Sequence, residues 1–508
     1  MKLRSLSERA DGHGFVYAMN GAGERETVTT LPGGAALAPE LRDAIRATHQ
    51  DLSPLAWRFL EYAREHPETA RAIDHRQAAA LSDWAHRYPF PLQPWPAFVD
   101  ARKLRQIERS TIALTALVKS IPERLFAGDA RRIGEFYGVP DELLVRLVLS
   151  PPNAIAAGFA RCDFVDDGGD FKCLELNFGG NLGGWQARFF EGACRAQPST
   201  AAFLGAERVQ VVHRDPWRTA LALVVAEGCR GGAGGADGFN VAVVKPAEAD
   251  AETIAAAVDD LFQEVLRAGG GGRGRAVTCT YPDGLTAQGG ALFHQGLRIG
   301  AVIEATAVPT PRHVFRCFKG GTVSLFNGPV SGFLGDKRNL ALLSLHEDSD
   351  LLTPVEREVV RRHVPWSRLV ADERTTYRGE SGRLLAIAAA RRDSLVLKPV
   401  DGSQGRGVCL GRCTAPGEWR RLLDESAGTR RMLLQEYVAS RPYLFQHGAA
   451  GCLPHQVVWG TFSLGETYGG GFLRMLPLDR GPGVINSARG ATEGLIFEVQ
   501  PEVSPPAS

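Results

Sequence analysis

The stretch Arg161–Gly184, RCDFVDDGGDFKCLELNFGGNLGG, carries the prediction of the fold. Two apolar-rich runs flank the acidic, glycine-containing turn DDGG, which predicts two short strands joined as a hairpin. Successive side chains of a strand point to opposite faces, so Arg161 and Asp163 share one face of the first strand. Glu175 and Asn177 share one face of the second strand for the same reason. The four polar groups are therefore expected to converge.

Two carboxylates and an amide oxygen are hard oxygen donors that suit Mg²⁺. This ion usually keeps several waters and takes its remaining ligands from nucleotide phosphates. Arg161 adds a fixed positive charge beside these donors. The same stretch also fits a hairpin whose polar face simply meets water, so the rest of the chain has to decide between the two interpretations.

The composition limits the classes of protein to consider. A chain of 508 residues exceeds the usual size of one core, so two or three domains are expected. A net charge of +1 creates no global field for nucleic acid or an acidic membrane, and we expect neither as a partner. The amino terminus lacks the apolar segment of a secretory signal, and no run of about 18 apolar residues occurs, so a cytoplasmic enzyme is expected. The nine cysteines form no CxxC pair, which argues against zinc or a disulfide framework.

The organisation of the chain follows from changes in hydrophobic period. Helical spacing predominates from about residue 39 to 148, and a Ser-Pro-Pro break precedes the hairpin. Further on, a strand–helix–strand unit predicts a parallel sheet. The stretches RHVFRCF and TVSLF are interpreted as a second hairpin. The predicted units are 1–150 (mainly helical), 151–200 (metal-binding strands), 205–330 (α/β), 331–500 (lysines, glycine-rich lid and adenine hinge) and 501–508 (a disordered tail).

The carboxy-terminal stretch 394–411, SLVLKPVDGSQGRGVCLG, pairs a strand that ends in Lys398 with a glycine-rich turn. The N–H groups of such a turn can fold over phosphates while the lysine compensates their charge. Lys337 begins an apolar helix, where the helix dipole disfavours a cation unless an anion is bound. For both lysines the alternative is an exposed surface residue. The residues expected to form the turn are Gly402, Ser403, Gln404, Gly405 and Gly407.

These motifs together resemble the ATP-grasp superfamily, and specifically its circularly permuted members. In the common order, as in D-alanine–D-alanine ligases, the lysine strand, glycine loop and adenine hinge precede an Arg-x-Asp-Phe strand and a Glu-x-Asn strand. Here Arg161-Cys162-Asp163-Phe164 and Glu175-Leu176-Asn177 come first. The resemblance covers about residues 155–195 and 315–498. It implies an α/β (α+β) ATP-grasp fold with a Rossmann-like pre-ATP-grasp domain and a helical amino-terminal region.

The resemblance also implies roles for individual residues. ATP phosphates would meet Lys337 and Lys398 beneath a mobile lid at 402–407. The acidic residue that commonly holds the ribose has no clear counterpart after Val438. The remaining implied roles are Mg²⁺ coordination by Asp163, Glu175 and Asn177, adenine binding by Gln435 and the main chain of Glu436 and Val438, stabilisation of the transferred phosphoryl group by Arg161 and Arg474, and an accessory contact from Asn486.

The implied activity is that of an ATP-dependent carboxylate–amine ligase. ATP would convert a small-molecule carboxylate into an acyl phosphate, and an amine would displace the phosphate to form an amide or peptide bond. ADP and phosphate would be released. Two alternatives stay open, which are a small-molecule kinase on the same fold and a non-catalytic nucleotide-binding module. The sequence names neither the acid nor the amine, and it leaves the oligomeric state open.

Overall fold

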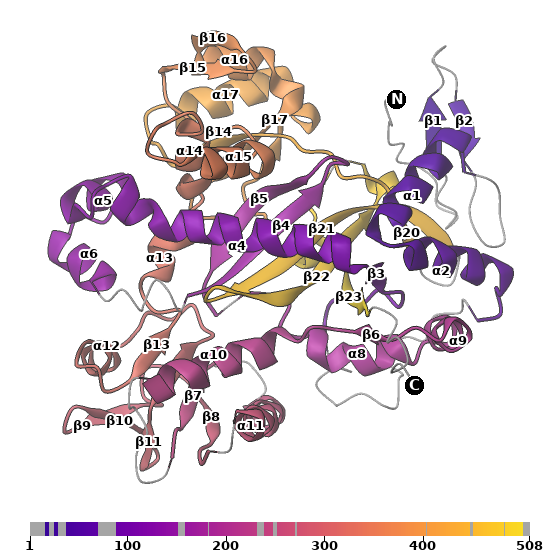
Figure 1. The fold of residues 1–508 in the computed structure, drawn as a ribbon. Coiled ribbons are helices and arrows are strands. Elements are labelled where there is room, and N and C mark those ends of the chain that lie inside the picture. Colours follow the sequence, from indigo (N-terminus) through magenta and orange to yellow (C-terminus); the bar gives the residue numbers. More distant parts are fainter. Residues whose placement is uncertain are drawn as a thin grey trace.

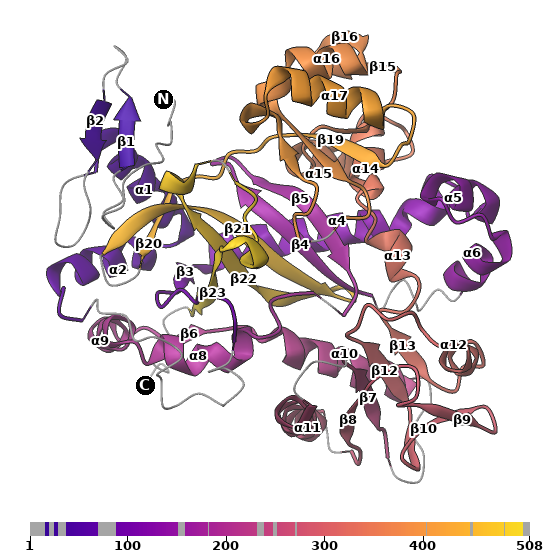
Figure 2. The same cartoon turned by 180° about the vertical axis from the view of Figure 1, so that it is seen from behind.

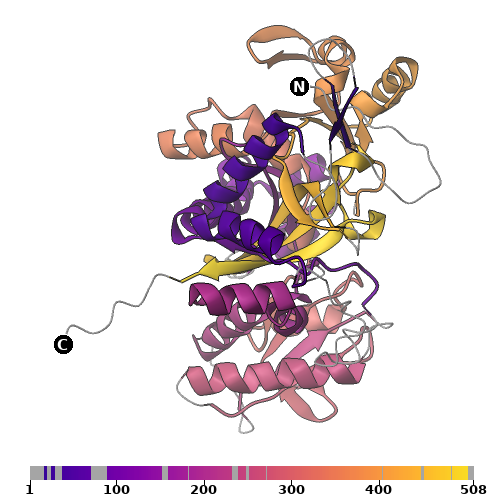
Figure 3. The same cartoon turned by 90° about the vertical axis from the view of Figure 1, so that its right-hand side faces the viewer.

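Three layers of structure are stacked in the molecule, with the largest sheet in the middle (Figure 3). A parallel sheet lies on one side of it, and a lobe built on an antiparallel sheet lies on the other (Figure 1). No helix in the described part of the chain is long and apolar enough to cross a membrane. The structure is a computed structural model that describes residues 16–19, 25–28, 37–69, 88–150, 158–180, 182–230, 238–246, 251–269, 272–402, 404–447, 451–481 and 483–500.

The large sheet has eight strands, in the order β3-β23-β22-β21-β4-β5, with β20 paired to β21 and β6 paired to β23. Most of its pairs are antiparallel, and the long β21–β22 hairpin forms its centre. Its strands are β3 (Ala97–Val99), β4 (Phe159–Asp166), β5 (Phe171–Phe178), β6 (Val211–Val212), β20 (Tyr443–Gln446), β21 (Cys452–Leu464), β22 (Thr467–Pro477) and β23 (Thr492–Val499).

One face of the large sheet is covered by the long helix α4 (Ala101–Arg124), which crosses it in Figure 1. Strand alternation directs Cys162 of β4 toward this helix, where its Sγ lies 3.7 Å from the hydroxyl oxygen of Thr115. The neighbouring Arg161 and Asp163 therefore point to the opposite face of the sheet, which is the face turned toward the viewer in Figure 2. The predicted hairpin β4–β5 is confirmed, and Asp163 lies directly across from Glu175 in its register.

The amino-terminal part is mainly helical, and capping residues explain where two of its helices begin. The side chain of Ser53 accepts a hydrogen bond from the N–H of Ala56, and that of Asp100 accepts one from Lys103. A small antiparallel hairpin, β1 (Val16–Met19) with β2 (Arg25–Val28), precedes the helices. The other helices here are α1 (Pro39–Leu52), α2 (Pro54–Glu65), α5 (Ala130–Tyr137) and α6 (Glu142–Leu149), while α8 (Ala187–Arg195) and α9 (Pro198–Glu207) follow β5.

The parallel sheet has the strand order β13-β12-β7-β8, and all three of its pairs are parallel. The predicted strand–helix–strand unit is confirmed as β7, α11 and β8. A three-stranded sheet, β9 (Thr286–Gln288), β10 (Ala291–His294) and β11 (Leu297–Ile299), is inserted before β12. The elements of the parallel sheet are β7 (Val241–Val244), β8 (Ala276–Cys279), β12 (Ala301–Glu304) and β13 (Ser324–Phe326), with helices α10 (Pro216–Arg230), α11 (Ala251–Ala268) and α12 (Arg312–Lys319).

The predicted hairpin of RHVFRCF and TVSLF is wrong. The first stretch forms helix α12, and the second contains β13, which pairs in parallel with β12. Val314 and Cys317, three residues apart, lie on one face of the helix and pack into the core of the parallel sheet. The seven-residue stretch RHVFRCF is too short for its apolar spacing to distinguish the period of a helix from that of a strand. Packing against the sheet therefore decides its structure.

The antiparallel lobe, which we define as residues 331–438, holds a four-stranded sheet in the order β14-β19-β17-β18. Its core is a separate apolar cluster that includes Leu395, Leu397, Trp419 and Leu434. The strands are β14 (Ser367–Leu369), β17 (Leu395–Pro399), β18 (Cys409–Leu410) and β19 (Met432–Glu436), with the hairpin β15 (Arg374–Tyr377) and β16 (Glu380–Arg383) and the helices α13 (Ser331–Leu334), α14 (Arg338–Leu345), α15 (Pro354–His363), α16 (Leu384–Ala390) and α17 (Pro416–Ser426).

The large sheet draws its strands from four of the five predicted sequence ranges. It takes β3 from range 1–150, β4 and β5 from 151–200, β6 from 205–330, and β20 to β23 from 331–500. The range 501–508 lies outside the described residues. A single sheet therefore gathers segments from nearly the whole chain.

Candidate functional site

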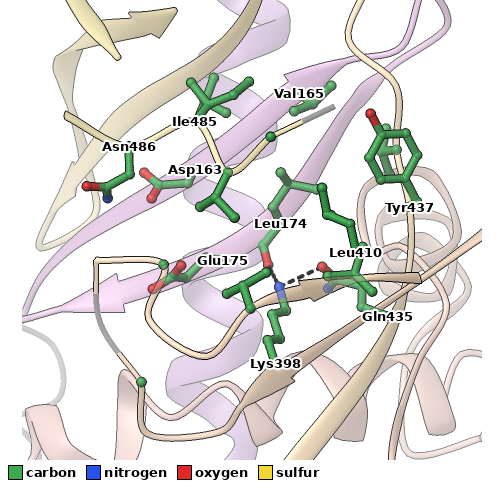
Figure 4. Close-up of a pocket in the computed structure, with 18 of the residues that line it drawn as sticks. Asp163, Val165, Leu174, Glu175, Lys398, Leu410, Gln435, Tyr437, Ile485 and Asn486 are labelled. Atoms are coloured by element: carbon green, nitrogen blue, oxygen red, sulfur yellow. Dashed lines mark hydrogen bonds between the residues drawn. The ribbon is translucent and has the colours of Figure 1, made fainter. Parts of the chain in front are cut away.

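A pocket lies between the antiparallel lobe and the open face of the large sheet (Figure 4). The cavity that it encloses has a volume of about 140 Å³, and the pocket is partly open to solvent. Ser403 is outside the described residues, and Arg161, Asn177, Gln404 and Gly407 adjoin the pocket without lining it. The other predicted site residues all line it: Asp163, Glu175, Lys337, Lys398, Gly402, Gly405, Gln435, Glu436, Val438, Arg474 and Asn486.

Lys398 joins the two distant parts of the sequence. It stands at the end of β17, and its Nζ donates to the carbonyl oxygen of Leu174 on β5 and to Oε1 of Gln435 on β19, each at 2.7 Å (Figure 4). Burial lowers the pKa of Lys398 to about 8, and the nearby charge of Lys337 acts in the same direction. An ammonium group has three donors, so one proton of Lys398 is available for a further acceptor.

Lys337 makes a second connection between the same two parts. It is the N-cap residue of α14, and its Nζ lies 3.2 Å from Oε1 of Glu175. The same ammonium donates to the carbonyl of Gly402 in the glycine-rich turn. Both lysines are nearly buried, whereas the Glu175 side chain is 29% exposed. Two cations therefore lie between β5 and the turn.

Asp163 is held between two arginines. Its Oδ1 accepts from Nε of Arg161 at 2.7 Å, and its Oδ2 accepts from the two terminal nitrogens of Arg161 and Arg474, at 3.0 and 2.7 Å. Burial alone would raise the pKa of Asp163, but the two guanidinium groups outweigh it and lower the pKa to about 2. The buried Nε of Arg474 has no hydrogen-bond partner in the described part of the chain. The Nε–H of Arg474 is therefore a donor that a ligand could use.

The three predicted metal ligands are on paired strands, Asp163 opposite Glu175 and Arg161 opposite Asn177. No group of three histidine, cysteine, aspartate or glutamate side chains suited to a metal occurs among the described residues. Asn177 directs its Nδ2 toward Asp163 at 3.3 Å, which leaves its Oδ1 as a donor to a cation. The carboxylate of Glu175 and this amide oxygen fit Mg²⁺, while the oxygens of Asp163 are engaged by arginines.

The glycine-rich turn has a backbone that favours glycine. Gln404, Gly405 and Gly407 have φ angles of 56°, 69° and 71°. A Cβ atom added at Gly405 would lie 2.4 Å from Cγ1 of Val484, so the turn directly contacts the loop that carries Asn486. These two loops meet at the edge of the pocket, which Gly405, Val484 and Asn486 all line.

The predicted adenine hinge is only partly available for a base. The N–H groups of Glu436 and Tyr437 donate to the carbonyls of Trp366 and Ser394, each at 2.8 Å. The side chain of Gln435 is engaged at both ends, because it accepts from Lys398 and donates to the hydroxyl of Ser367. The Glu436 carbonyl and the Val438 N–H are the main-chain groups here that suit a purine edge. Asn486 uses its Oδ1 to accept from the N–H of Ala488.

Sequence reasoning missed a carboxylate beside the arginines. Glu493 lies across from Arg474 in the β22–β23 pairing and is buried. Its Oε2 accepts from the hydroxyl of Tyr88 and from Nε2 of Gln186, each at 2.7 Å, and its Oε1 accepts from the hydroxyl of Ser487 at 2.5 Å. A glutamate within the buried strand TEGLIFEV was the available signal, since a buried acid requires partners.

Comparison with known proteins shows a likeness in fold only. No protein-family model matches the chain, and no curated protein matches its sequence. Among solved structures, it is similar to a glutathione synthetase-like effector from Globodera pallida in its apo form, with a TM-score of 0.50 and 11% identity. The match covers 91% of this chain and 99% of that one. The protein therefore has a mixed α/β fold that is similar to the fold of this structure.

Proposed function

We propose that the protein is an ATP-dependent carboxylate–amine ligase that forms an amide or peptide bond and releases ADP and phosphate. The observation that carries this proposal is the hydrogen bond from Lys398 on β17 to the carbonyl of Leu174 on β5. Lys398, Lys337 and Arg474 line one pocket with Glu175 and Asp163, and Arg161 adjoins it. Such a concentration of cations suits a triphosphate.

Each residue of the pocket has a role in this proposal. Lys337 and Lys398 would neutralise the phosphate charge, and the turn at 402–407 would exclude water from the reacting groups. The unpartnered donor of Arg474, with Arg161 beside it, would stabilise the transferred phosphoryl group. The Glu436 carbonyl and the Val438 N–H would hold adenine. Gln435 would orient Lys398, and Asn486 would fix the loop that meets the turn.

ATP would supply the phosphoryl group that makes the carboxylate carbon open to attack by an amine, and Mg²⁺ would neutralise charge on the phosphates. Glu175 and Asn177 would hold this ion, and Asp163 would join them only by releasing an arginine. A carboxylate is a poor acyl donor because its oxygen is a poor leaving group, so activation has to precede amide formation. Catalysis then consists of positioning and charge stabilisation, with no protein nucleophile.

We further propose that the chain is a circularly permuted ATP-grasp protein with a Rossmann-like pre-ATP-grasp domain at 205–330. In support, the strands that carry Arg161 and Glu175 precede the Lys398 strand in the sequence, yet Lys398 contacts the Glu175 strand in space. The parallel sheet with its crossover helix supports the second part. The name of the solved neighbour, a glutathione synthetase-like effector, is in keeping with a ligase fold.

The proposal is tested by a screen for ADP release. Paired small carboxylates and amines, including amino acids and polyamines, are incubated with MgATP, and products are identified by mass. We expect ADP release that requires both an acid and an amine, together with an amide product. Lys398→Met should abolish it, and Lys119→Met should not. Lys119 is a matched control, because it is a mostly buried lysine on α4 whose pKa burial also lowers to about 8. A stable phosphorylated product formed without an amine would contradict ligation.

A further inference from the structure

A buried carboxylate outside the proposed nucleotide site has no evident structural reason for its position. Glu304 ends β12 and is 5% exposed. Its Oε1 accepts from the hydroxyl of Tyr281 at 2.6 Å, and its Oε2 accepts from the hydroxyl of Thr310 at 2.9 Å. Glu304 forms no ion pair in the part of the chain that the structure describes. Hydroxyl groups hydrogen-bond to a carboxylate but do not neutralise it, so the cost of burying the charge is only partly offset.

Glu304 lies at the point of the parallel sheet where ligands bind in open α/β structures. From β7 the chain continues through α11 to β8, and from β12 it continues through α12 to β13. These strands are neighbours, and Glu304 pairs with Val244, the last residue of β7. Helix α11 packs on one face of the sheet and α12 on the other. The two connections therefore diverge at the carboxyl ends of β7 and β12, beside Glu304.

The loop after Asn177 connects this position to the proposed nucleotide site. A Cβ atom added at Gly180 would lie 2.1 Å from the carbonyl oxygen of Glu304, so the loop packs closely on the end of β12. Three residues further on, the carbonyl of Gly183 accepts from Arg161 at 2.8 Å. The same short loop therefore contacts both Glu304 and an arginine proposed to stabilise the phosphoryl group.

A second buried polar group with unused capacity lies at the same edge. Asn327 directly follows β13, whose last residue, Phe326, pairs with Ile303, the neighbour of Glu304. Its Oδ1 accepts from the N–H of Phe159, the first residue of β4. Its buried Nδ2 has no partner in the described ranges. Among the described residues, this sheet edge therefore presents an acid with no cationic partner and an amide donor with no acceptor, next to the strand that carries Arg161.

We propose that Glu304, with Tyr281 and Thr310, binds a primary ammonium group of a substrate at the carboxyl edge of the parallel sheet. This rests on the proposed ligase function and deepens it, because it makes one of the two substrates an amine-bearing small molecule that is held by its charge. Each carboxylate oxygen keeps a lone pair beyond the hydroxyl bonds, which an ammonium can use. The ammonium also supplies the missing positive charge, which gives a charge-assisted hydrogen bond. An anionic group would be repelled there.

The test measures binding of simple amines by thermal unfolding and calorimetry on the full chain. Putrescine and methylammonium are the cationic probes, and succinate and acetate are the anionic ones. We expect the amines, and not the anions, to raise the unfolding midpoint of the wild type. Glu304→Gln keeps the shape of the side chain and should weaken putrescine binding at least about tenfold. Tyr281→Phe keeps the carboxylate but removes one of its hydroxyl partners, and it should weaken putrescine binding less than Glu304→Gln does.

The outcomes separate this inference from the proposed function, because MgATP binding is measured on the same samples. If MgATP binds the wild type and Glu304→Gln alike while neither amine binds the wild type, the inference fails and the proposed function stands. Equal amine binding by the wild type and Glu304→Gln, or a preference for succinate, would also overturn it. Loss of amine binding confined to Glu304→Gln, with MgATP binding unchanged, would support it. Circular dichroism verifies that each variant is folded.

Discussion

At the scale of single residues, the pocket is defined by a small number of buried charges that compensate one another. Asp163 lies between Arg161 and Arg474 and offsets part of their positive charge, while Glu175 lies beside Lys337 and near Lys398. A buried ion pair adds little net stability, but removal of one member leaves an uncompensated charge. Substitutions here therefore report on the charge arrangement more than on packing.

Asp163→Asn should destabilise the protein strongly. The change keeps the shape of the side chain but leaves two buried guanidinium groups without their shared carboxylate. We expect a loss of about 3–5 kcal/mol in the free energy of unfolding, measured with urea. Glu175→Gln is the comparison, since its carboxylate is 29% exposed and forms one ion pair, and it should cost less than Asp163→Asn. Equal losses for the two variants would contradict this account of the arginine pair.

Nucleotide affinity should fall as the pH rises through about 8. Lys398 binds phosphate in its protonated form, and its pKa is lowered to about 8 by burial. The charge is present at pH 7 and largely lost at pH 9, so we expect affinity for MgATP to fall about tenfold between them, measured by calorimetry. Lys398→Met should bind weakly without this pH dependence.

A second lysine with the same pKa provides the control for this experiment. Lys119 also has its pKa lowered to about 8, but it lies on α4 and donates to the carbonyl of Gly465. Lys119→Met should keep the full pH dependence of binding. If it removed that dependence, Lys398 would not be its source.

At the scale of elements, two loops and one helix hold the pocket together. The glycine-rich turn contacts the loop at Val484, and α4 supports the opposite face of the large sheet. The strand–turn pattern around Lys398 could be predicted because it is local, as could the β4–β5 hairpin. The contact between the two loops could not, since nothing in the sequence sets a distance between residues 405 and 484. The partners of Glu493 escaped prediction for the same reason.

Gly405→Ala should impair turnover far more than it affects the fold. The residue has a φ of 69°, and a new Cβ would lie 2.4 Å from Val484, so the turn would have to move. We expect kcat/KM in the ADP-release assay to fall about 10- to 100-fold. Gly417→Ala on α17 introduces a Cβ with nothing within 4 Å and should be neutral. Wild-type activity of Gly405→Ala would contradict the proposed role of the turn.

Helix α4 is joined to the sheet by a buried ion network. Lys103 lies 2.9 Å from Asp166 at the end of β4 and 2.7 Å from Asp51, which also pairs with Arg441 just after the hinge. Lys103→Met would leave buried Asp166 with the more distant Arg441, at 3.7 Å, as its remaining cationic partner among the described residues. We expect a loss of about 3–5 kcal/mol in unfolding free energy. Arg102→Met removes the exposed neighbouring cation and should cost under about 1 kcal/mol, while similar costs for both would count against the network.

At the scale of the whole molecule, segments far apart in the sequence form one pocket. The order of the motifs along the sequence predicted a circular permutation. The predicted mixed α/β class is confirmed. The predicted sequence ranges did not indicate that one sheet would take strands from four of them. Range boundaries follow composition, whereas strand partners such as β3 with β23 depend on long-range pairing. The permutation itself stays a proposal supported by the contact between Lys398 and Leu174.

Calorimetric titration of a non-hydrolysable ATP analogue with Mg²⁺ tests the central claim most directly, using the wild type, Glu175→Gln and Lys398→Met. These two residues come from distant parts of the chain and line one pocket. The account predicts one binding site on the wild type and at least about tenfold weaker binding by each variant. Wild-type affinity in either variant, with the protein folded, would show that the two segments do not hold the same nucleotide and would contradict it.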